Sequence, residues 1–385
     1  MTTSSDGRGE PSFPRIGWVT NVSAPYRHPV WSAMAGRTNL TVGLLAENES
    51  NRRWSAALPN GVSRLPLRSL CLRWRSLHLY VLRQSALRSA PIDALVLPGW
   101  ENPAAWQLLL DARRRKIATV GFYESTDASH AFGGGVVARA RSRFFRAVDV
   151  VVTVGRASER AVLGFGVDAD RIVRADNAVD VQGIHQAAKL AAPPLAPRTS
   201  HFVYVGQLIE RKNVDAILTA FAQQDPETRL SIAGEGPEAA KLARRSVQLG
   251  ISERVQFLGY VAPEAVASLL STAQTLVLAS TVEVYGLVVK EALAAGLHVV
   301  VSRPCGVAED VADMDGVYIC ETSPESIAAA MRRSSAEWSG MIGSPDVLRH
   351  TPDAMAAEVI RACSMAMSLA ENRRGSRWRR QVTNE

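Results

Sequence analysis

Two glutamates, Glu283 and Glu291, stand eight residues apart in the segment Glu283-Val-Tyr-Gly-Leu-Val-Val-Lys-Glu291. If the segment were helical throughout, a rise of about 1.5 Å per residue would separate them by roughly 12 Å. Carboxylates that far apart cannot share a proton or a metal ion, but they suit the two ends of an elongated ligand. A helix N-terminus between them would offer N–H groups and a positive dipole end to a diphosphate. The spacing therefore fits a nucleotide-sugar, with its sugar at Glu283 and its ribose at Glu291. The alternative is a solvated loop glutamate and a surface helix glutamate.

The residues around this segment predict the elements that position it. The apolar run 275–279 predicts a buried strand, and a helical stretch from Leu287 ends at Gly296, a residue type suited to a helix C-terminus. A second apolar run, 298–301, predicts the next strand. Glu283 is therefore expected at the carboxyl end of a strand and Glu291 on the helix behind it. Open α/β sheets bind ligands at that edge.

Apolar runs alternate with amphipathic segments over most of the chain. Further strands are predicted at 15–20, 39–45, 93–98, 117–123, 148–154, 201–205, 229–233 and 255–258. Further helices are predicted at 103–115, 214–223, 239–249, 263–271, 324–333 and 352–371. This alternation indicates βαβ units and parallel sheets. A Pro-rich break at 191–200 separates two similar α/β halves, which would leave a cleft between them.

Length and composition narrow the class of protein. With 385 residues and 47% hydrophobic content, the chain is long enough for two globular domains. No apolar run approaches the ~18 residues of a membrane-spanning helix, and the polar N-terminus lacks the apolar core of a signal peptide. The four cysteines show no paired spacing, so neither a disulfide framework nor a zinc site is indicated. These features favour the cytoplasm.

Positive charge is concentrated in the first half of the chain. Residues 1–195 hold 25 Lys and Arg against 15 Asp and Glu, whereas residues 196–385 hold 19 against 22. Basic stretches at 64–75, 113–116 and 139–146 combine arginine with Leu, Trp and Phe, a composition that suits an anionic membrane surface. The alternative is an ordinary arginine-rich surface. No recognisable nucleic-acid-binding motif accompanies the charge, so nucleic acid is not an expected partner.

Five segments of the second half occur in a recognisable order. They are Val205-Gly-Gln-Leu-Ile-Glu-Arg-Lys-Asn213, Ile232-Ala-Gly-Glu-Gly-Pro237, Val255-Gln-Phe-Leu-Gly-Tyr-Val261, the stretch from Glu283 through Glu291 to Gly296, and Val301-Ser-Arg-Pro-Cys-Gly-Val-Ala-Glu-Asp-Val311. In these segments the chain resembles the family-four retaining glycosyltransferases of the GT-B fold. The resemblance covers nearly the whole chain and is sharpest from 201 to 311. It implies two Rossmann-like parallel-sheet domains that face a central cleft, with a C-terminal helix returning to the first domain.

The resemblance also implies domain limits. Residues 1–14 would be a disordered lead, 15–192 an acceptor-binding domain and 193–200 a Pro-rich linker. Residues 201–350 would bind the nucleotide-sugar, and 351–385 would cross back to the first domain. Within the crossing regions, Asn177-Ala-Val-Asp180 would fix the domain crossing, and the closing segment 376–380 would pack on the first domain through Trp378.

For the donor site, the resemblance implies a role for each matched residue. Glu283 would hold the donor sugar and Glu291 the ribose hydroxyls. Arg211 and Lys212 would neutralise the leaving diphosphate, because this fold usually uses basic side chains and a helix dipole in place of a metal. The alternative for Lys212 is a solvated lysine at a helix start. No metal or other cofactor is expected.

The remaining donor contacts implied by the resemblance come from loops. They involve Gly206, Tyr260, Val284, Tyr285, Gly286 and Leu287. Gly206 would let the backbone approach the phosphates closely, and the N–H groups of residues 284–287 would bind the diphosphate. The segment around Tyr260 would meet the nucleobase, unless Tyr260 is a packing aromatic.

The chain departs from the family pattern at three places. Gln207 stands where many members have an arginine beside the phosphates, a contact for which Arg211 would compensate. Tyr285 replaces the usual phenylalanine. Many members also place a histidine after the strand predicted at 117–123, and here Glu124 is expected in that place, with His130 as the alternative. Glu124 would otherwise cap the next segment.

The loop after the first strand, residues 20–29, replaces the glycine-rich loop of many members. It should face the cleft, where Arg27 or His28 would meet phosphate or acceptor unless each is a structural or surface residue.

These features together predict a cytoplasmic glycosyltransferase. It would move a sugar from a nucleoside-diphosphate sugar to an acceptor hydroxyl with retention, in cell-envelope, exopolysaccharide or glycolipid biosynthesis. The acceptor would be a glycan, a lipid-linked glycan or a small molecule, and the enzyme would contact the inner face of the plasma membrane peripherally. One alternative is a phosphorylase or a nucleotide-sugar epimerase of the same fold; another is a catalytically silent sugar- or membrane-binding partner. The sequence leaves open the nucleotide base, the sugar, the acceptor and the oligomeric state.

Overall fold

The computed structural model describes residues 13–47, 57–74, 77–84, 86–88, 90–129, 134–191 and 200–382. Most of the expected lead and linker, at 1–12 and 192–199, lies outside these ranges, and so does His130.

The first α/β domain is built on a seven-stranded parallel sheet with the strand order β3-β2-β1-β6-β7-β8-β9. Its strands are β1 (Arg15–Thr20), β2 (Asn39–Leu44), β3 (Ser63–Arg64), β6 (Ala94–Leu97), β7 (Ala118–Tyr123), β8 (Val150–Val154) and β9 (Ile172–Ala175). Its helices are α1 (His28–Ala35), α2 (Pro103–Arg115), α3 (Gly135–Ala147) and α4 (Arg156–Gly164). The helix that follows, α5 (Val181–Ala191), packs on the second domain.

Both faces of this sheet are covered by helices. In β8, Val150 and Val152 belong to one core cluster, together with apolar residues of α1 and of the last helix. Val151 belongs to the other cluster, with residues of α2, α3 and α4. A strand buried on both faces reads as a continuous apolar run, which is why the sequence predicted it.

The second α/β domain is built on a six-stranded parallel sheet with the strand order β12-β11-β10-β13-β14-β15. Its strands are β10 (His201–Val205), β11 (Arg229–Ala233), β12 (Val255–Gly259), β13 (Thr275–Leu278), β14 (His298–Ser302) and β15 (Val317–Cys320). Its helices are α6 (Val214–Phe221), α7 (Ala239–Gln248), α8 (Pro263–Leu270), α9 (Leu287–Ala294), α10 (Ala308–Val311) and α11 (Pro324–Glu337). The expected fold class of two parallel-sheet α/β domains is confirmed.

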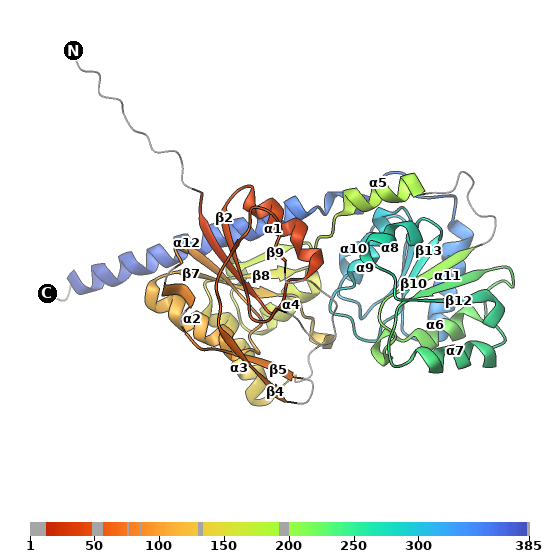
Figure 1. The fold of residues 1–385 in the computed structure, drawn as a ribbon, viewed down its shortest axis with the longest axis horizontal. Coiled ribbons are helices and arrows are strands. Elements are labelled where there is room, and N and C mark those ends of the chain that lie inside the picture. The colour runs from red at the N-terminus through yellow and green to blue at the C-terminus, as the bar shows by residue number, and fades with distance from the viewer. Residues whose placement is uncertain are drawn as a thin grey trace, which may run out of the picture.

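The last helix, α12 (Pro352–Val382), runs back along the first domain as the long blue helix of Figure 1. It packs on α1 and on strands β6 to β9, and Arg373 forms an ion pair with the buried Asp149. The side chain of Trp378, the expected anchor, lies outside the described part of the chain. Within the described ranges, no helix is both long and apolar enough to cross a membrane.

The structure contains elements that were not predicted from the sequence, among them α1, α3, α4, α5, β15 and a hairpin. Residues 64–75 were expected only as a basic stretch, but β4 (Ser69–Trp74) pairs antiparallel with β5 (Leu77–Leu82) to form a separate hairpin. The alternation of Leu with other residues in both strands carries the signal for a half-buried hairpin.

Candidate active site

The carboxyl ends of β10, β11 and β12 meet through close backbone contacts. Gly234 has φ +148°, and its N–H donates to the carbonyl of Gly259 at 2.7 Å. A Cβ at Gly234 would overlap the carbonyl of Gly206, and a Cβ at Gly236 would overlap the carbonyl of Leu208. Glycine is therefore required by these loop–loop contacts. Close approach of Gly206 to a phosphate stays a prediction.

Arg211 and Lys212 lie in a short 3₁₀ turn, Glu210–Lys212, between β10 and α6. The turn ends at Asn213, which has a left-handed backbone (φ +57°). The Asn213 side-chain amide donates to the carbonyls of Ala279 at 3.1 Å and Thr322 at 2.9 Å. Asn213 thereby ties the basic turn to the end of β13, which leads into the loop that carries Glu283.

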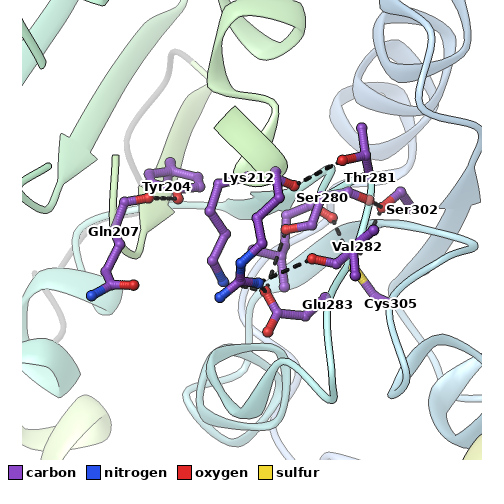
Figure 2. A network of polar contacts seen from close by, with 11 residues as sticks. Tyr204, Gln207, Lys212, Ser280, Thr281, Val282, Glu283, Ser302 and Cys305 are labelled. Carbon is purple, nitrogen blue, oxygen red and sulfur yellow. Dashed lines mark hydrogen bonds and ion pairs between the residues drawn. The ribbon is translucent and has the colours of Figure 1, made fainter. Parts of the chain in front are cut away.

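The side chains of Lys212 and Glu283 meet in Figure 2, and Arg211 lies beside them. The ammonium of Lys212 forms an ion pair with Oε2 of Glu283, and Nη1 of Arg211 lies 3.7 Å from the same oxygen. Arg211 also donates to the carbonyl of Val282 at 3.0 Å. The Glu283 and Lys212 side chains are 10% and 12% exposed, whereas Arg211 is 43% exposed. A shielded ion pair thus stands beside a solvent-facing cation.

Backbone contacts hold Glu283 in place. The N–H of Gly306 donates to the Glu283 carbonyl at 3.1 Å, and the N–H of Val307 donates to the Tyr285 carbonyl at 2.9 Å. The Ser280 hydroxyl lies 3.4 Å from Oε2 of Glu283. Burial raises the pKa of the nearby Cys305 thiol to about 11, so this thiol stays neutral beneath the ion pair.

Glu291 lies on α9, which begins only at Leu287. Glu283 therefore lies in the loop before the helix, as the sequence predicted, and the helical rise applies to only half of the interval, about 6 Å. Glu291 is half-buried, and burial raises its pKa to about 7. α9 ends as predicted, with Gly296 in a left-handed conformation (φ +85°) just after its last turn.

The loop of Val284, Tyr285, Gly286 and Leu287 lies between the two glutamates and leads into the N-terminus of α9. Gly286 precedes the helix with φ +99°. Tyr285 is buried, whereas Val284 is 38% exposed. The loop reaches the first domain, because a Cβ at Gly306 would touch both the Val284 carbonyl and, at 3.2 Å, the methyl group of Thr126. Residues after β7 therefore lie against the loop that carries Glu283.

Glu124 immediately follows β7, two residues before Thr126. Its Oε2 lies 2.5 Å from Nη2 of Arg27, a guanidinium that is 6% exposed and lies over the ring of Phe122 at 4.6 Å. Glu124 is therefore the partner of a buried cation. Both side chains line a cavity of about 190 Å³ at the carboxyl ends of β1, β6 and β7.

Two residues that were expected near the donor, Tyr260 and Gln207, are exposed to solvent. Tyr260 follows β12 and is 51% exposed. Gln207 is exposed, and its carbonyl accepts a hydrogen bond from the buried Tyr204 hydroxyl at 2.8 Å. Figure 2 shows its side chain apart from the Lys212–Glu283 pair. No group of three or more His, Cys, Asp or Glu that could hold a metal ion occurs in the described ranges.

Comparison with known families agrees with this geometry. A model of the glycosyl transferases group 1 matches residues 187–338, and a model of glycosyltransferase family 4 matches residues 39–182. The first match covers the Lys212–Glu283 pair and α9, and the second covers the sheet that carries Glu124. The chain belongs to the family 4 glycosyltransferases.

Curated relatives match this family 4 chain over part of its length. An uncharacterized glycosyltransferase of Methanocaldococcus jannaschii is 32% identical over 35% of this chain and 36% of its own length. A GDP-mannose-dependent phosphatidylinositol dimannoside mannosyltransferase of Mycobacterium tuberculosis is 32% identical over 48% of each chain. The chain thus spans a third to a half of the length of these curated relatives.

Solved structures match over nearly the whole family 4 chain. HepE of Anabaena, crystallised with UDP, has a TM-score of 0.65 at 16% identity and covers 94% of this chain and 100% of that one. Sucrose-phosphate synthase of Thermosynechococcus elongatus has a TM-score of 0.64 at 14% identity and covers 96% and 100%. These similarities establish the GT-B fold.

Sequence reasoning missed several residues that build the site of this family 4 protein. Asn213 was not predicted to have a role of its own, although its two hydrogen bonds place the basic turn. Lys290, between the two matched glutamates, was not predicted to have a role and is fully buried. Asp310 and Arg156 join the two domains through a hydrogen bond from the Arg156 N–H to Oδ1 of Asp310 at 2.9 Å. The sequence alone carried no signal for these long-range contacts.

Proposed function

We propose that this chain transfers a sugar from a nucleoside-diphosphate sugar to an acceptor hydroxyl with retention of the anomeric configuration. The observation that carries the proposal is the convergence of Arg211 and Lys212 on Glu283 beside the N-terminus of α9. Two cations and a helix N-terminus at one sheet edge suit a diphosphate, and the adjacent carboxylate suits sugar hydroxyls. The match to the group 1 family model over the same residues supports it.

In this proposal the site acts by stabilising the charge of the leaving group. As the bond to the anomeric carbon breaks, negative charge grows on the departing diphosphate and positive charge on the sugar. Arg211, Lys212 and the N–H groups of residues 284–287 would stabilise the diphosphate. The leaving phosphate oxygen would accept the acceptor proton, so no separate base is needed. Closure of the two domains would exclude water and suppress hydrolysis of the donor.

Metal independence is part of the same proposal. Arg211 and Lys212 supply two positive charges where other transferases use a divalent cation, and a guanidinium can bind two phosphate oxygens at once. The described residues hold both groups within reach of one carboxylate oxygen. We therefore propose donor binding through these side chains without a resident cofactor.

The printed names of related proteins suggest donors to test. Structures of HepE were determined with UDP and with UDP-glucose, and a mycobacterial relative is named as GDP-mannose-dependent. Uridine and guanosine diphosphate sugars are therefore the first candidates. We propose that Tyr260 and its neighbours meet the base and that Glu291 accepts hydrogen bonds from the ribose hydroxyls.

The acceptor is proposed to be a glycan or a glycolipid of the cell envelope. The mycobacterial relative is named for a phosphatidylinositol mannoside. In this chain α3 carries the exposed arginines Arg139, Arg143 and Arg146, with Val136 78% exposed at the same helix. Such a face suits an anionic lipid surface. We propose a cytoplasmic protein that contacts the inner face of the plasma membrane peripherally.

Two other activities are compatible with the fold. A phosphorylase or a nucleotide-sugar epimerase would use the same sheet edges, and a silent binding partner would keep the pocket without turnover. The ion pair of Lys212 with Glu283 and the cation Arg211 favour the transferase, because these residues suit the charge of a departing diphosphate.

The test measures turnover of UDP-glucose, UDP-N-acetylglucosamine and GDP-mannose with two kinds of acceptor, glycans without a lipid and lipid-linked glycans. Proton NMR of the first product formed gives its anomeric configuration. The proposal predicts release of the nucleoside diphosphate and an α-linked product from an α-linked donor in the presence of EDTA. An inverted product, or a strict need for inorganic phosphate in the reverse reaction, would overturn it.

A further inference from the structure

Lys290 is a fully buried lysine on α9, one residue before Glu291. Its ammonium donates to the carbonyl of Asn177 at 2.9 Å and lies 2.9 Å from Nδ1 of His350. Asn177 belongs to the segment in which the chain leaves the first sheet, and His350 precedes α12, which returns to it. The helix of the donor site and both crossing segments therefore meet at one ammonium group.

Burial opposes the charge of this ammonium, although its polar neighbours can accept its hydrogen bonds. Its described neighbours are a backbone carbonyl, an imidazole and the ring of Tyr285, whose centroid lies 5.4 Å from Nζ. Burial lowers the pKa of Lys290 to about 8, against the opposing fields of Asp176 and Asp310. Removing an ammonium from water is costly, and an apolar side chain of similar volume would fill the space at lower cost. A lysine here points to a role other than stability.

We propose that Lys290 is a positioning residue that ties α9 to the domain crossing at Asn177 and so sets the place of Glu291 and of the loop before α9. The effect of Lys290 on catalysis rests on the proposed function. The hydrogen bond that joins α9 to Asn177 does not. Lys290 would act through α9 and would not touch the donor.

Other contacts show that the domains meet closely around this tie. Gly155 has φ +81°, and a Cβ there would overlap the carboxylate of Asp310 in the second domain. Arg160 donates to both carboxylate oxygens of Glu309 at 2.7 and 2.8 Å. At the other end of α9, Nδ1 of His185 lies 2.8 Å from the Ala294 carbonyl. The contact at Ala294 lies within the second domain, because α5 packs on α8 and α9, whereas Lys290 joins the middle of α9 to the crossing segments.

The strength of the hydrogen bonds from Lys290 to Asn177 and His350 depends on whether Lys290 is protonated. When charged, Lys290 donates to the lone pair of His350 Nδ1, so the imidazole proton is on Nε2. When neutral, Lys290 can accept a hydrogen bond from Nδ1–H, and Nε2 can then accept a hydrogen bond from Nε of Arg349, which lies 3.3 Å away. A bond from a charged donor is roughly twice as strong as a neutral one. Loss of the proton is therefore expected to loosen α9 from Asn177.

Several titratable groups face Lys290, and its neighbour on α9, Glu291, has a pKa raised by burial to about 7. From the packed elements the groups that face Lys290 are Asp176, Tyr285, Asp310, Arg349 and His350. Burial lowers the pKa of His350 to about 4, with Lys290 as the next cause, so the imidazole is neutral above pH 5. Burial raises the pKa of Tyr285 and of Asp310.

The test is hydrogen exchange of the full chain, followed in peptides that cover α9 and residues 176–184. We compare wild type with Lys290→Met, and with Lys241→Met as the matched control on an exposed lysine of α7. The proposal predicts that Lys290→Met leaves the melting temperature unchanged or raised, yet speeds exchange of both peptides by about tenfold or more. The control should match wild type. Wild type itself, corrected for intrinsic exchange, should show the same change between pH 7 and pH 9.5.

A second readout separates this proposal from the proposed function. Binding of UDP and GDP to Lys290→Met should weaken by about tenfold, with the loss largest below pH 8, where wild-type Lys290 is charged. If neither nucleotide binds wild type, the donor site fails and the exchange result still stands. Exchange at wild-type rates in both peptides of Lys290→Met, or no pH effect in wild type, would overturn the positioning role. If Lys290→Met does not fold, Lys290→Gln and the wild-type pH series decide the question.

Discussion

Lys212 and Glu283 form an ion pair across 71 positions of the chain, between the turn after β10 and the loop after β13. Asn213 bridges the same two segments through the Ala279 carbonyl. The pair is thus set by the fold before any ligand arrives. A donor sugar and diphosphate would then meet a carboxylate and a cation that are already in place, so little rearrangement is needed at the moment of reaction.

Breaking this pair should abolish most activity. Lys212→Met and Glu283→Gln are each expected to lower turnover by at least about 100-fold, because each removes a charge that the transition state needs. The double variant should be no slower than the slower single variant, since the two side chains act as a unit. Steady-state kinetics on all three, with Lys241→Met as control, checks this. Additive losses in the double variant would show that the residues act separately.

Gly234 should tolerate no side chain. Alanine there would overlap the Gly206 carbonyl and would adopt an unfavourable backbone at φ +148°. Gly234→Ala is therefore expected to lower the free energy of unfolding by about 2 kcal/mol or more. Gly164 at the end of α4 has open space around it, so Gly164→Ala should be neutral or slightly stabilising. Urea denaturation measures both, and equal effects would contradict the close loop contact.

Glu291 should make both stability and ligand binding depend on pH. Burial raises its folded-state pKa to about 7 from an ordinary 4.5, so its contribution to stability is present below pH 4.5 and is lost as pH rises through 7. The shift corresponds to at most about 3 kcal/mol. Glu291→Gln should therefore be more stable than wild type at pH 8 and equal to it at pH 4.5.

Nucleotide affinity should show the opposite trend. If the ionised Glu291 accepts ribose hydroxyls, wild-type affinity for a nucleoside diphosphate rises between pH 6 and pH 8, and the Gln variant binds weakly at both. Calorimetry at the two pH values measures this. Equal wild-type affinity at pH 6 and pH 8 would remove Glu291 from the ribose site.

Glu124 is expected to have two roles: it pairs with the buried Arg27, and it contacts substrate in the cleft. Glu124→Ala leaves the buried Arg27 without its anion, which should cost about 3 to 5 kcal/mol of stability. Glu124→Gln keeps a hydrogen-bond acceptor for Arg27 and should cost less. If Glu124 faces substrate, the Gln variant still loses at least about tenfold in turnover. Normal turnover in a folded Glu124→Gln enzyme would leave only the structural role.

The sequence predicted local elements well and long-range contacts poorly. The limits of β1, β10, β11 and α2 match the predictions because strands buried on both faces and helices with proline at the first turn have clear local signals. The hairpin of β4 and β5 was missed because its alternating pattern lies within a basic stretch. The burial of Lys290 and the pairing of Arg27 with Glu124 depend on segments far apart in the chain, which periodicity does not bring together.

At the candidate active site too, local motifs were predicted well and effects of tertiary burial were not. The matched motifs gave Arg211, Lys212 and Glu283 as one group, and the structure brings them together. Glu283 lies in the loop before α9 and Glu291 on the helix, in the order that the sequence predicted. The pKa of Glu291 follows from tertiary burial and has no counterpart in the local sequence.

The most direct test of the account is thermal unfolding of the purified chain with UDP, GDP, ADP and dTDP and their common sugar conjugates, first without metal and then with Mg²⁺. A ligand that binds only the native state at about 100 times its dissociation constant stabilises it by roughly 2.7 kcal/mol, which such a measurement resolves. We predict a selective shift without metal in wild type that is lost in Glu291→Ala. A folded chain that none of these compounds stabilises, with or without Mg²⁺, would contradict the donor site.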